Sequence, residues 1–242
     1  MGTNIRGIHH LTTITSDSPK IWDFFTNKLG LHLIKKTVNQ DDVRTYHLYF
    51  SDDQGEGGSV LTFFDFPGIQ KAVFGTDEIS RTSFRVPSQD SFAYWQARFD
   101  EFGIRYDSKT YELFGATYLN FYDFDDQRYA LIADDTNPRH NELTGTHTPW
   151  RHSSVDPQHA IVGLGLELLT INNHDAMDMV LTKVMGAEKI DTKGDYALYE
   201  FDHGGYGAQV ITLLSRIIPR GLQGFGGPCL LYTSDAADDG ES

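Results

Sequence analysis

Three segments of the chain carry apolar residues at the spacing of an amphipathic helix. They span residues 16–30, 89–103 and 174–186. The first two begin near a serine or aspartate, which suits the start of a helix. All three end at a glycine, which predicts a left-handed C-cap at Gly30, Gly103 and Gly186. These glycines lie 73 and 83 residues apart. That interval is too long for a solenoid and fits a repeated supersecondary module.

Each predicted helix follows one strand-like run and precedes three more. Val, Ile, Tyr, Phe and Thr dominate these runs, with polar turns between them. The repeated unit is therefore β-α-β-β-β, and the predicted fold class is α+β, because one helix covers one face of each small sheet. The other, concave face is left for a site. The predicted strands fall at 5–15, 31–38, 45–52 and 59–66, then at 79–87, 105–112, 116–124 and 128–134, then at 160–171, 187–192, 196–202 and 208–215.

The repeats divide the chain into four parts. Residues 1–135 form a first pair of modules, 136–159 a polar linker rich in Pro, Gly and Thr, and 160–227 a third module with the glycine-rich lead-in to a fourth. Residues 228–242 contain four acidic residues and no Lys or Arg. This tail is typical of a non-native, adaptor-like sequence or of a disordered acidic end. We expect no stable packing after about Gly227, as in a chain truncated before its fourth module.

Composition narrows the function. Hydrophobic residues make up 39% and charged residues 22% of the 242 residues, which is typical of a globular protein. The net charge of -14 argues against nucleic acid as a partner, and no apolar run is long enough for a membrane span. The single cysteine, Cys229, excludes an intramolecular disulfide, so a cytoplasmic protein is expected, with a homo-oligomer as a possible assembly. Neither nucleotide-binding glycine loops nor a GxSxG nucleophile motif occurs, so no organic cofactor is predicted.

Local strings narrow the fold to a family. GIHHLT at 7–12 is followed by LGLHLIKKTVNQDD, TYHLYF and GSVLTFF. Together these strings resemble the opening module of hydroquinone-type ring-cleaving dioxygenases in the vicinal oxygen chelate superfamily, which also holds glyoxalases and bleomycin-resistance proteins. Residues 155–163 resemble that family's entry into its third module. The resemblance runs from about residue 5 to about residue 227, and it implies four modules in the intact family protein.

The resemblance also implies a cofactor. The family holds one non-haem Fe(II), or in some members Mn(II), with two His and one Glu. The second histidine of the opening pair, here His10, corresponds to the first ligand. The second His and the Glu belong to the fourth module, and this chain reads Gly227, Pro228 and Cys229 where that His is expected. Two of the three expected ligands are thus absent from this chain.

Three further residues are candidate catalytic groups. Alternation along a strand predicts that His9 and His10 point to opposite faces, so His9 is either a residue supporting the site or part of the core. Thr12 shares the face of His10 and could orient a ligand, or it is an ordinary strand threonine. His47 shares a face with Tyr49 and could act as an acid or base, although sheet packing is favoured for this region.

Other titratable residues carry weaker hypotheses. Lys35 and Lys36 could clamp a substrate, although a solvated strand end fits them better. Glu167 could be a ligand on the third module's first strand. The linker holds several histidines, but without an HxH or HExxH spacing a linker metal site is not favoured. His159 is expected to fix the linker against the body of the protein.

The predicted activity is that of an oxidoreductase. An enzyme of this kind opens the ring of a hydroquinone- or catechol-like aromatic diol with O2 at Fe(II). The present chain, which lacks two of the expected ligands, is expected to be inactive. Two alternatives stay open. One is a metal-free small-molecule binding protein of the bleomycin-resistance type, and the other is a glyoxalase-type lyase or isomerase.

Overall fold

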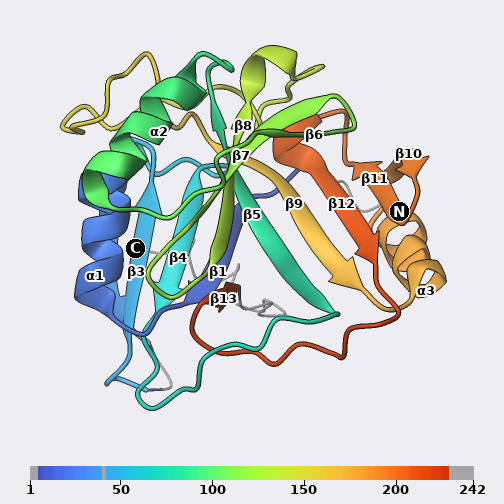
Figure 1. The fold of residues 1–242 in the computed structure, drawn as a ribbon, viewed down its shortest axis with the longest axis horizontal. Coiled ribbons are helices and arrows are strands. Elements are labelled where there is room, and N and C mark those ends of the chain that lie inside the picture. The colour runs from blue at the N-terminus through green and yellow to red at the C-terminus, as the bar shows by residue number, and fades with distance from the viewer. Residues whose placement is uncertain (1–4, 40–41, 229–242) are drawn as a thin grey trace.

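The computed structural model describes residues 5–39 and 42–228. Two sheets carry the fold (Figure 1). The first has five strands in the order β13-β1-β4-β3-β2, and the second has eight in the order β10-β11-β12-β9-β5-β8-β7-β6. Within each of three modules the first and last strands pair in parallel, as β1 with β4, β5 with β8 and β9 with β12. This shared topology confirms the predicted α+β class with repeated β-α-β-β-β modules.

The element bounds follow the predicted repeat. Module one contains β1 (His10–Ile14), α1 (Ser18–Trp22), the π-helix η1 (Asp23–Lys28), β2 (His32–Val38), β3 (Tyr46–Ser51) and β4 (Val60–Phe64). Module two contains β5 (Glu78–Val86), α2 (Ser91–Phe102), β6 (Tyr111–Leu113), β7 (Ala116–Tyr122) and β8 (Arg128–Ala133). Module three contains β9 (Leu164–Ile171), α3 (His174–Met179), the π-helix η3 (Val180–Val184), β10 (Glu188–Lys193), β11 (Tyr196–Glu200) and β12 (Gln209–Leu214). Two short 3-10 helices, η2 (Asp134–Thr136) and η4 (Gly205–Ala208), and the strand β13 (Gly227–Pro228) complete the described elements.

The three predicted C-cap glycines are confirmed. Gly30, Gly103 and Gly186 have φ values of 79°, 63° and 81°, in the left-handed region where a side chain is strained. The helices differ in one respect from the prediction, because the first and third end in π turns. Apolar spacing did not reveal these turns.

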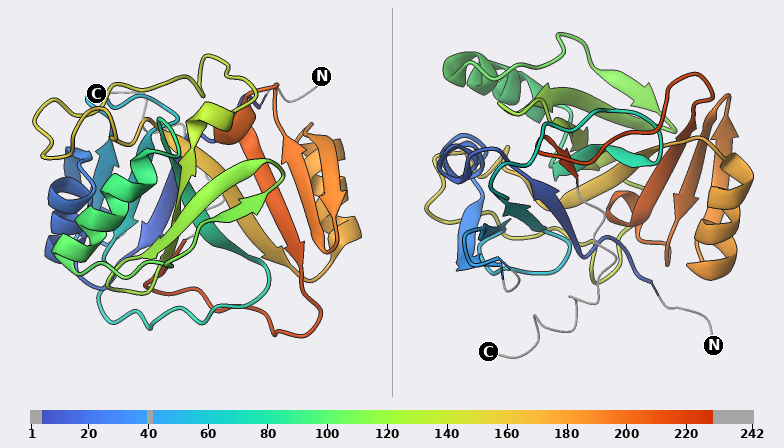
Figure 2. Two further views of the ribbon diagram at one scale, coloured as in Figure 1. Left: turned by 45° about the horizontal axis from the view of Figure 1, so that its top comes forward. Right: turned by 90° about the horizontal axis from the view of Figure 1, so that it is seen from below.

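The main core lies between the two sheets. Phe25 on η1 packs against Phe50 and Phe63 of the first sheet and against Phe84 and Tyr129 of the second. Modules one and two therefore share one hydrophobic core, whereas α3 packs over a separate cluster at the other end of the second sheet (Figure 2).

The modules that share a sheet are not the modules that share a core. Strand β5 of module two pairs antiparallel with β9 of module three, so these two modules share one sheet. Strand β1 pairs antiparallel with β13 in the same way. Modules one and two, grouped as the first pair in the sequence, thus share a core but not a sheet. The division at residues 135 and 159 stays a prediction, and the predicted fate of the tail concerns residues that, apart from Pro228, lie outside the described ones.

Candidate functional site

The first sheet has one face toward η1 and one face away from it. Leu11, Leu48 and Phe63 enter the core, so alternation turns their neighbours to the opposite face. We call that opposite face the His10 face. Its residues are His10, Thr12, His47, Tyr49, Thr62 and Phe64.

His9 and His10 do not point apart as alternation predicted. Strand β1 begins only at His10, so His9 lies before the region where alternation holds. The two Nδ1 atoms lie 3.2 Å apart, and the rings meet edge to face. Gly57 lies against the His9 ring, where an added Cβ would come within 2.7 Å of it. His9 is therefore positioned to fix the orientation of the His10 ring.

Register separates the other candidate residues into rows across the sheet. Thr12 lies opposite Thr62, which lies opposite Tyr49, and the two threonine hydroxyls are 3.1 Å apart. His10 lies one row before Thr12, and His47, opposite Phe64, lies one row after it. Two row spacings therefore separate His47 from His10. Four residues at about 3.3 Å each separate these two histidines by roughly 13 Å along the strand direction. Tyr49 occupies the row between, and its hydroxyl contacts His47 Nδ1 at 2.8 Å.

The edge strand beside β1 is β13, which comes from more than 200 residues further along the chain. Thr13 pairs with Pro228 and Ile14 with Gly227, in antiparallel register. The region predicted to begin a fourth module thus lies beside the strand that carries His10. A strand continuing this register in a longer protein would pass next to Thr12, Leu11 and His10.

A second cluster of potential ligands lies close by. Asp52, Glu56 and His147 offer ligand atoms that all lie within 4.8 Å of one another, which makes them a possible three-residue metal site. His147 Nδ1 is 3.1 Å from Glu56 Oε2 and 3.8 Å from Asp52 Oδ2. Asp52 Oδ1 accepts hydrogen bonds from the loop backbone, whereas its buried Oδ2 has no hydrogen-bond partner among the described residues. We call this group the Asp52 cluster.

Sequence motifs alone do not predict the Asp52 cluster. His147 comes from the linker and the two acids from the β3–β4 loop, so no short spacing joins them. The linker is fixed against module one by further contacts. Arg151 pairs with Asp53, and Trp150 stacks on His32 at a ring distance of 5.3 Å. His159 also anchors the linker, as expected, because its ring stacks on Tyr94 at 4.7 Å.

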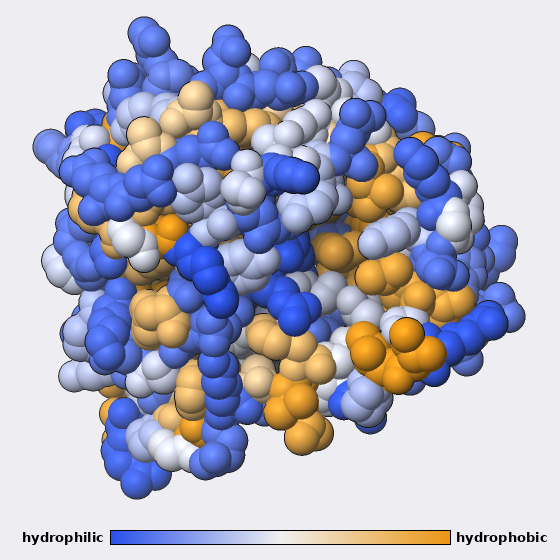
Figure 3. Space-filling view, viewed as in Figure 1, coloured by the Kyte–Doolittle hydropathy of each residue, from blue (hydrophilic) through white to orange (hydrophobic). Residues whose placement is uncertain are grey.

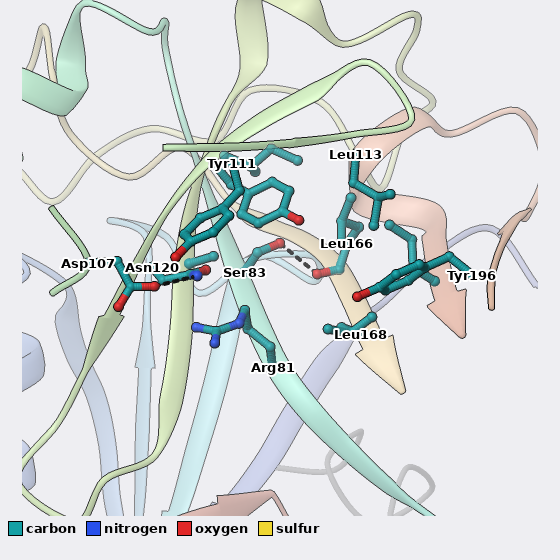
Figure 4. A pocket seen from close by; sticks show the side chains of 13 residues that line it. Arg81, Ser83, Asp107, Tyr111, Leu113, Asn120, Leu166, Leu168 and Tyr196 are labelled. Atoms are coloured by element: carbon teal, nitrogen blue, oxygen red, sulfur yellow. Dashed lines mark hydrogen bonds between the residues drawn. The ribbon is translucent and has the colours of Figure 1, made fainter. Parts of the chain in front are cut away.

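The second sheet carries a pocket on its face away from the helices (Figure 4). Its volume is about 340 Å³. At one end lie Arg81, Asp107 and Asn120, and the Asn120 amide donates to the Asp107 carboxylate at 2.8 Å. The rest is largely apolar or aromatic, and Figure 3 shows apolar side chains gathered over β9 and β12. The lining residues are Arg81, Ser83, Asp107, Tyr111, Leu113, Tyr118, Asn120, Ala130, Ile132, Leu166, Leu168, Tyr196 and Ile211.

Two other sequence candidates lie away from these sites. Glu167 sits between the pocket residues Leu166 and Leu168 and therefore points to the opposite face. Burial there raises the pKa of Glu167 well above its usual range. Lys35 lies over the Tyr49 ring at 5.1 Å, and Lys36 over the Tyr46 ring at 4.3 Å, so each packs along the edge of the first sheet.

Comparison with known proteins identifies the fold family. Residues 7–131, half of the chain, match the model of the Glyoxalase/Bleomycin resistance protein/Dioxygenase superfamily. The chain belongs to this superfamily. Over 227 residues it is 33% identical to "Putative ring-cleaving dioxygenase MhqA" of Bacillus subtilis, covering 92% of this chain and 70% of that protein. A second Bacillus subtilis relative, named "Putative ring-cleaving dioxygenase MhqO", is 34% identical over 93% of this chain and 68% of its own length.

Three further proteins help to place the chain. The chlorohydroquinone/hydroquinone 1,2-dioxygenase of Sphingobium indicum is 28% identical over 83% of this chain and 61% of its own length. A solved structure of a "putative dioxygenase" from Bacillus subtilis superposes with a TM-score of 0.80 at 32% identity, over 94% of this chain and 68% of that one. Maize glyoxalase I, at 11% identity and a TM-score of 0.63 over 93% of this chain and 72% of its own, shares the fold alone.

The family's metal can be tested against the residues present. Around His10 the described residues supply imidazole groups and hydroxyls but no carboxylate within a common ligand sphere. Among residues 5–39 and 42–228, only the Asp52 cluster brings three ligand atoms together, and it does not include His10. The described residues therefore do not make the two-His, one-Glu set on their own. No membrane-spanning helix was found within the same ranges, because none is long and apolar enough.

Proposed function

We propose that this protein is a ring-cleaving dioxygenase that opens hydroquinone- or catechol-like aromatic diols with O2. The relatives named as ring-cleaving dioxygenases support this class of enzyme, and they match more than nine-tenths of the chain. One observation supports the location of the active site near His10. Gly227 and Pro228, which we interpret as the entry to a fourth module, pair with the strand that bears His10, and this supports a fourth module that meets module one near His10.

We propose Fe(II) as the metal of this enzyme, with His10 as one ligand and the other two supplied by a fourth module. Because the described residues around His10 do not complete the ligand set, we expect the present chain to hold iron weakly and to turn over no diol. Affinity for Fe(II) depends on several ligands held together by surrounding groups.

The residues of the His10 face suggest separate roles. His9 orients the His10 ring through the contact between their Nδ1 atoms. Thr12 lies beside His10 in the neighbouring row and offers a hydroxyl to orient a substrate oxygen. His47 is too far along the strand direction to bind the same metal ion as His10. We propose that His47 acts through Tyr49, because it contacts the Tyr49 hydroxyl and can take up its proton.

An oxygen-electrode experiment tests the proposal. Residues 1–228 are joined to the fourth module of a relative, loaded anaerobically with Fe(II), and mixed with hydroquinone or catechol. We expect diol-dependent oxygen uptake by the extended protein and none by the present chain. His10→Ala in the extended protein should abolish both iron binding and uptake. Full iron occupancy in that variant would rule out the ligand role of His10, and turnover by the present chain would contradict its expected inactivity.

A second measurement tests the roles of His47 and Tyr49. In the extended protein, Tyr49→Phe and His47→Gln should each lower kcat with little change in iron content. If His47 acts through Tyr49, His47→Gln should have little further effect in the Tyr49→Phe background, whereas additive losses would indicate independent roles.

A further inference from the structure

The two sheets are related by the repeat, and this relation assigns counterparts to His10. His10 lies 20 residues before the C-cap glycine of its module. The same distance before Gly103 and Gly186 gives Ser83 and Leu166. Both residues line the pocket of the second sheet, and the Ser83 hydroxyl donates to the Leu166 carbonyl at 2.6 Å. The pocket is thus the internal counterpart of the His10 face, with a serine and a leucine at the positions that correspond to His10.

The pocket has a complete frame. Strands β5 and β9 pair at its centre, so two full modules contribute to its walls. Leu166 and Leu168 of β9 lie on its floor and Tyr196 stands at one side (Figure 4), and Ile132 and Tyr118 also line the cavity. A cavity of about 340 Å³ falls in the size range of small-molecule sites, and such a lining favours a flat apolar ring.

The polar end of the pocket, where Arg81 and Asp107 lie, determines which substituent on a ligand ring can bind there. Within the described part of the chain, the Arg81 guanidinium makes one hydrogen bond, from Nη1 to the Tyr129 carbonyl, which leaves other N–H groups as donors. Asp107 lies at the same end and can accept a hydrogen bond (Figure 4). A neutral hydroxyl can accept from the guanidinium and donate to the Asp107 carboxylate, which also accepts from Asn120 and Tyr122. A ligand carboxylate could pair with Arg81 but would then lie beside the negative charge of Asp107 and could not donate to it.

We propose that this pocket is a metal-free binding site for a neutral, single-ring phenol of the hydroquinone type. The ring lies on the Leu166 and Leu168 floor, and a hydroxyl meets Arg81 and Asp107. The site is separate from the His10 face and needs neither iron nor oxygen. It therefore does not rest on the proposed function, although the same class of compound serves both.

Equilibrium dialysis tests the proposal on the present chain. The protein is treated with EDTA and dialysed under argon against hydroquinone, with benzoate as a probe of the charge preference. We expect one equivalent of hydroquinone bound and little benzoate. Arg81→Gln should weaken hydroquinone binding about tenfold, which corresponds to one charge-assisted hydrogen bond. Leu168→Trp, which fills the pocket from a half-buried position, should remove binding.

Matched variants distinguish binding in the pocket from binding elsewhere on the protein. Arg216→Gln and Ile217→Trp make the same changes at exposed positions outside the pocket, and both should bind as the unaltered chain does. His10→Ala should also bind normally. Loss of binding in His10→Ala, unchanged binding in both pocket variants, or tighter binding of benzoate than of hydroquinone would each overturn the proposal. Because the dialysis uses neither metal nor oxygen, these outcomes are independent of the oxygen-uptake test.

Discussion

The two sheets present opposite chemistry on their faces away from the helices. The His10 face carries imidazole and hydroxyl groups on strands of one module, whereas the pocket face carries aliphatic and tyrosine side chains from two modules. The backbone frame is the same, since β13 approaches β1 as β9 approaches β5. The proposed metal ligand His10 and the pocket residues Ser83 and Leu166 thus occupy repeat-related positions on similar frames.

Removing the guanidinium of Arg85, on the interior strand β5 of the second sheet, should have the largest effect. Arg85 is fully buried, pairs with Asp134, and donates to the carbonyls of Leu164 and Gly145. Arg85→Met leaves a buried carboxylate without its partner, so we expect a loss of about 5 kcal/mol in the free energy of unfolding. Urea denaturation measures it. In the double variant that adds Asp134→Leu, part of the loss should return, because the unpaired charge is gone; no recovery would contradict this mechanism.

The joint between the two sheets should make stability depend on pH. The turn after β7 reaches β1, where Thr13 donates to Gln127 at 2.7 Å and Thr15 to Asp125 at 2.9 Å. At the base of this turn, burial raises the pKa of Asp123 to about 7. The folded protein therefore holds this proton between about pH 4 and 7, where an unfolded aspartate has released it. Stability from this group is present at low pH and is lost as the pH rises through this range, by roughly 1.4 kcal/mol for each pH unit.

Asp123→Asn tests this sign. Asparagine keeps an oxygen to accept from the Asp125 and Gln127 backbone N–H groups but carries no charge. Denaturation at pH 4, 5.5 and 7 should show that the fall in stability attributable to this group disappears in the variant. Asp100→Asn, at an exposed helix position, is the matched control and should leave the pH profile unchanged. A steeper fall in Asp123→Asn than in the unaltered chain would show that the sign is wrong.

Equivalent glycines in the two regions should differ in their tolerance of a side chain. Gly103 has open space around an added Cβ, so Gly103→Ala should cost only the strain of positive φ, about 1 kcal/mol. At Gly30 the added Cβ would lie 2.3 Å from Ser153 Oγ and 2.6 Å from Val155 Cγ2. Gly30→Ala should therefore cost roughly 2–3 kcal/mol, because the linker packs on it. Thermal unfolding of the two variants measures the difference, and equal losses would mean that the linker gives way easily.

The sequence predicted local structure better than it predicted assembly. Apolar spacing and the terminal glycines located all three helices, because both signals are local. It could not show that module two shares a sheet with module three, since edge pairing depends on contacts between residues far apart in the chain, such as Thr82 with Glu167. The candidate site divides in the same way. His10 and Thr12 follow from one strand, whereas the Asp52 cluster joins a loop to a linker 91 residues away.

The smallest expected change in stability comes from a variant of the Asp52 cluster. This variant tests whether a metal ion can bind to the protein away from the His10 face. Glu56 is exposed, so Glu56→Gln should cost less than about 1 kcal/mol without metal. If the three residues bind a divalent ion, Zn²⁺ or Mn²⁺ at ten times its Kd should stabilise the unaltered chain by about 1.4 kcal/mol. We expect this shift in the midpoint of thermal unfolding for the unaltered chain and for His10→Ala, but not for Glu56→Gln.

A matched carboxylate elsewhere completes that experiment. Glu101→Gln removes an equivalent charge from the exposed end of α2 and should keep the full metal-dependent shift. If Glu56→Gln keeps the shift while His10→Ala loses it, the ion binds at the His10 face and the Asp52 cluster is an ion pair that fastens the linker. If both variants keep it, the metal binds at neither place. Only loss in Glu56→Gln with retention in His10→Ala assigns the ion to Asp52, Glu56 and His147, because these variants change one candidate site at a time.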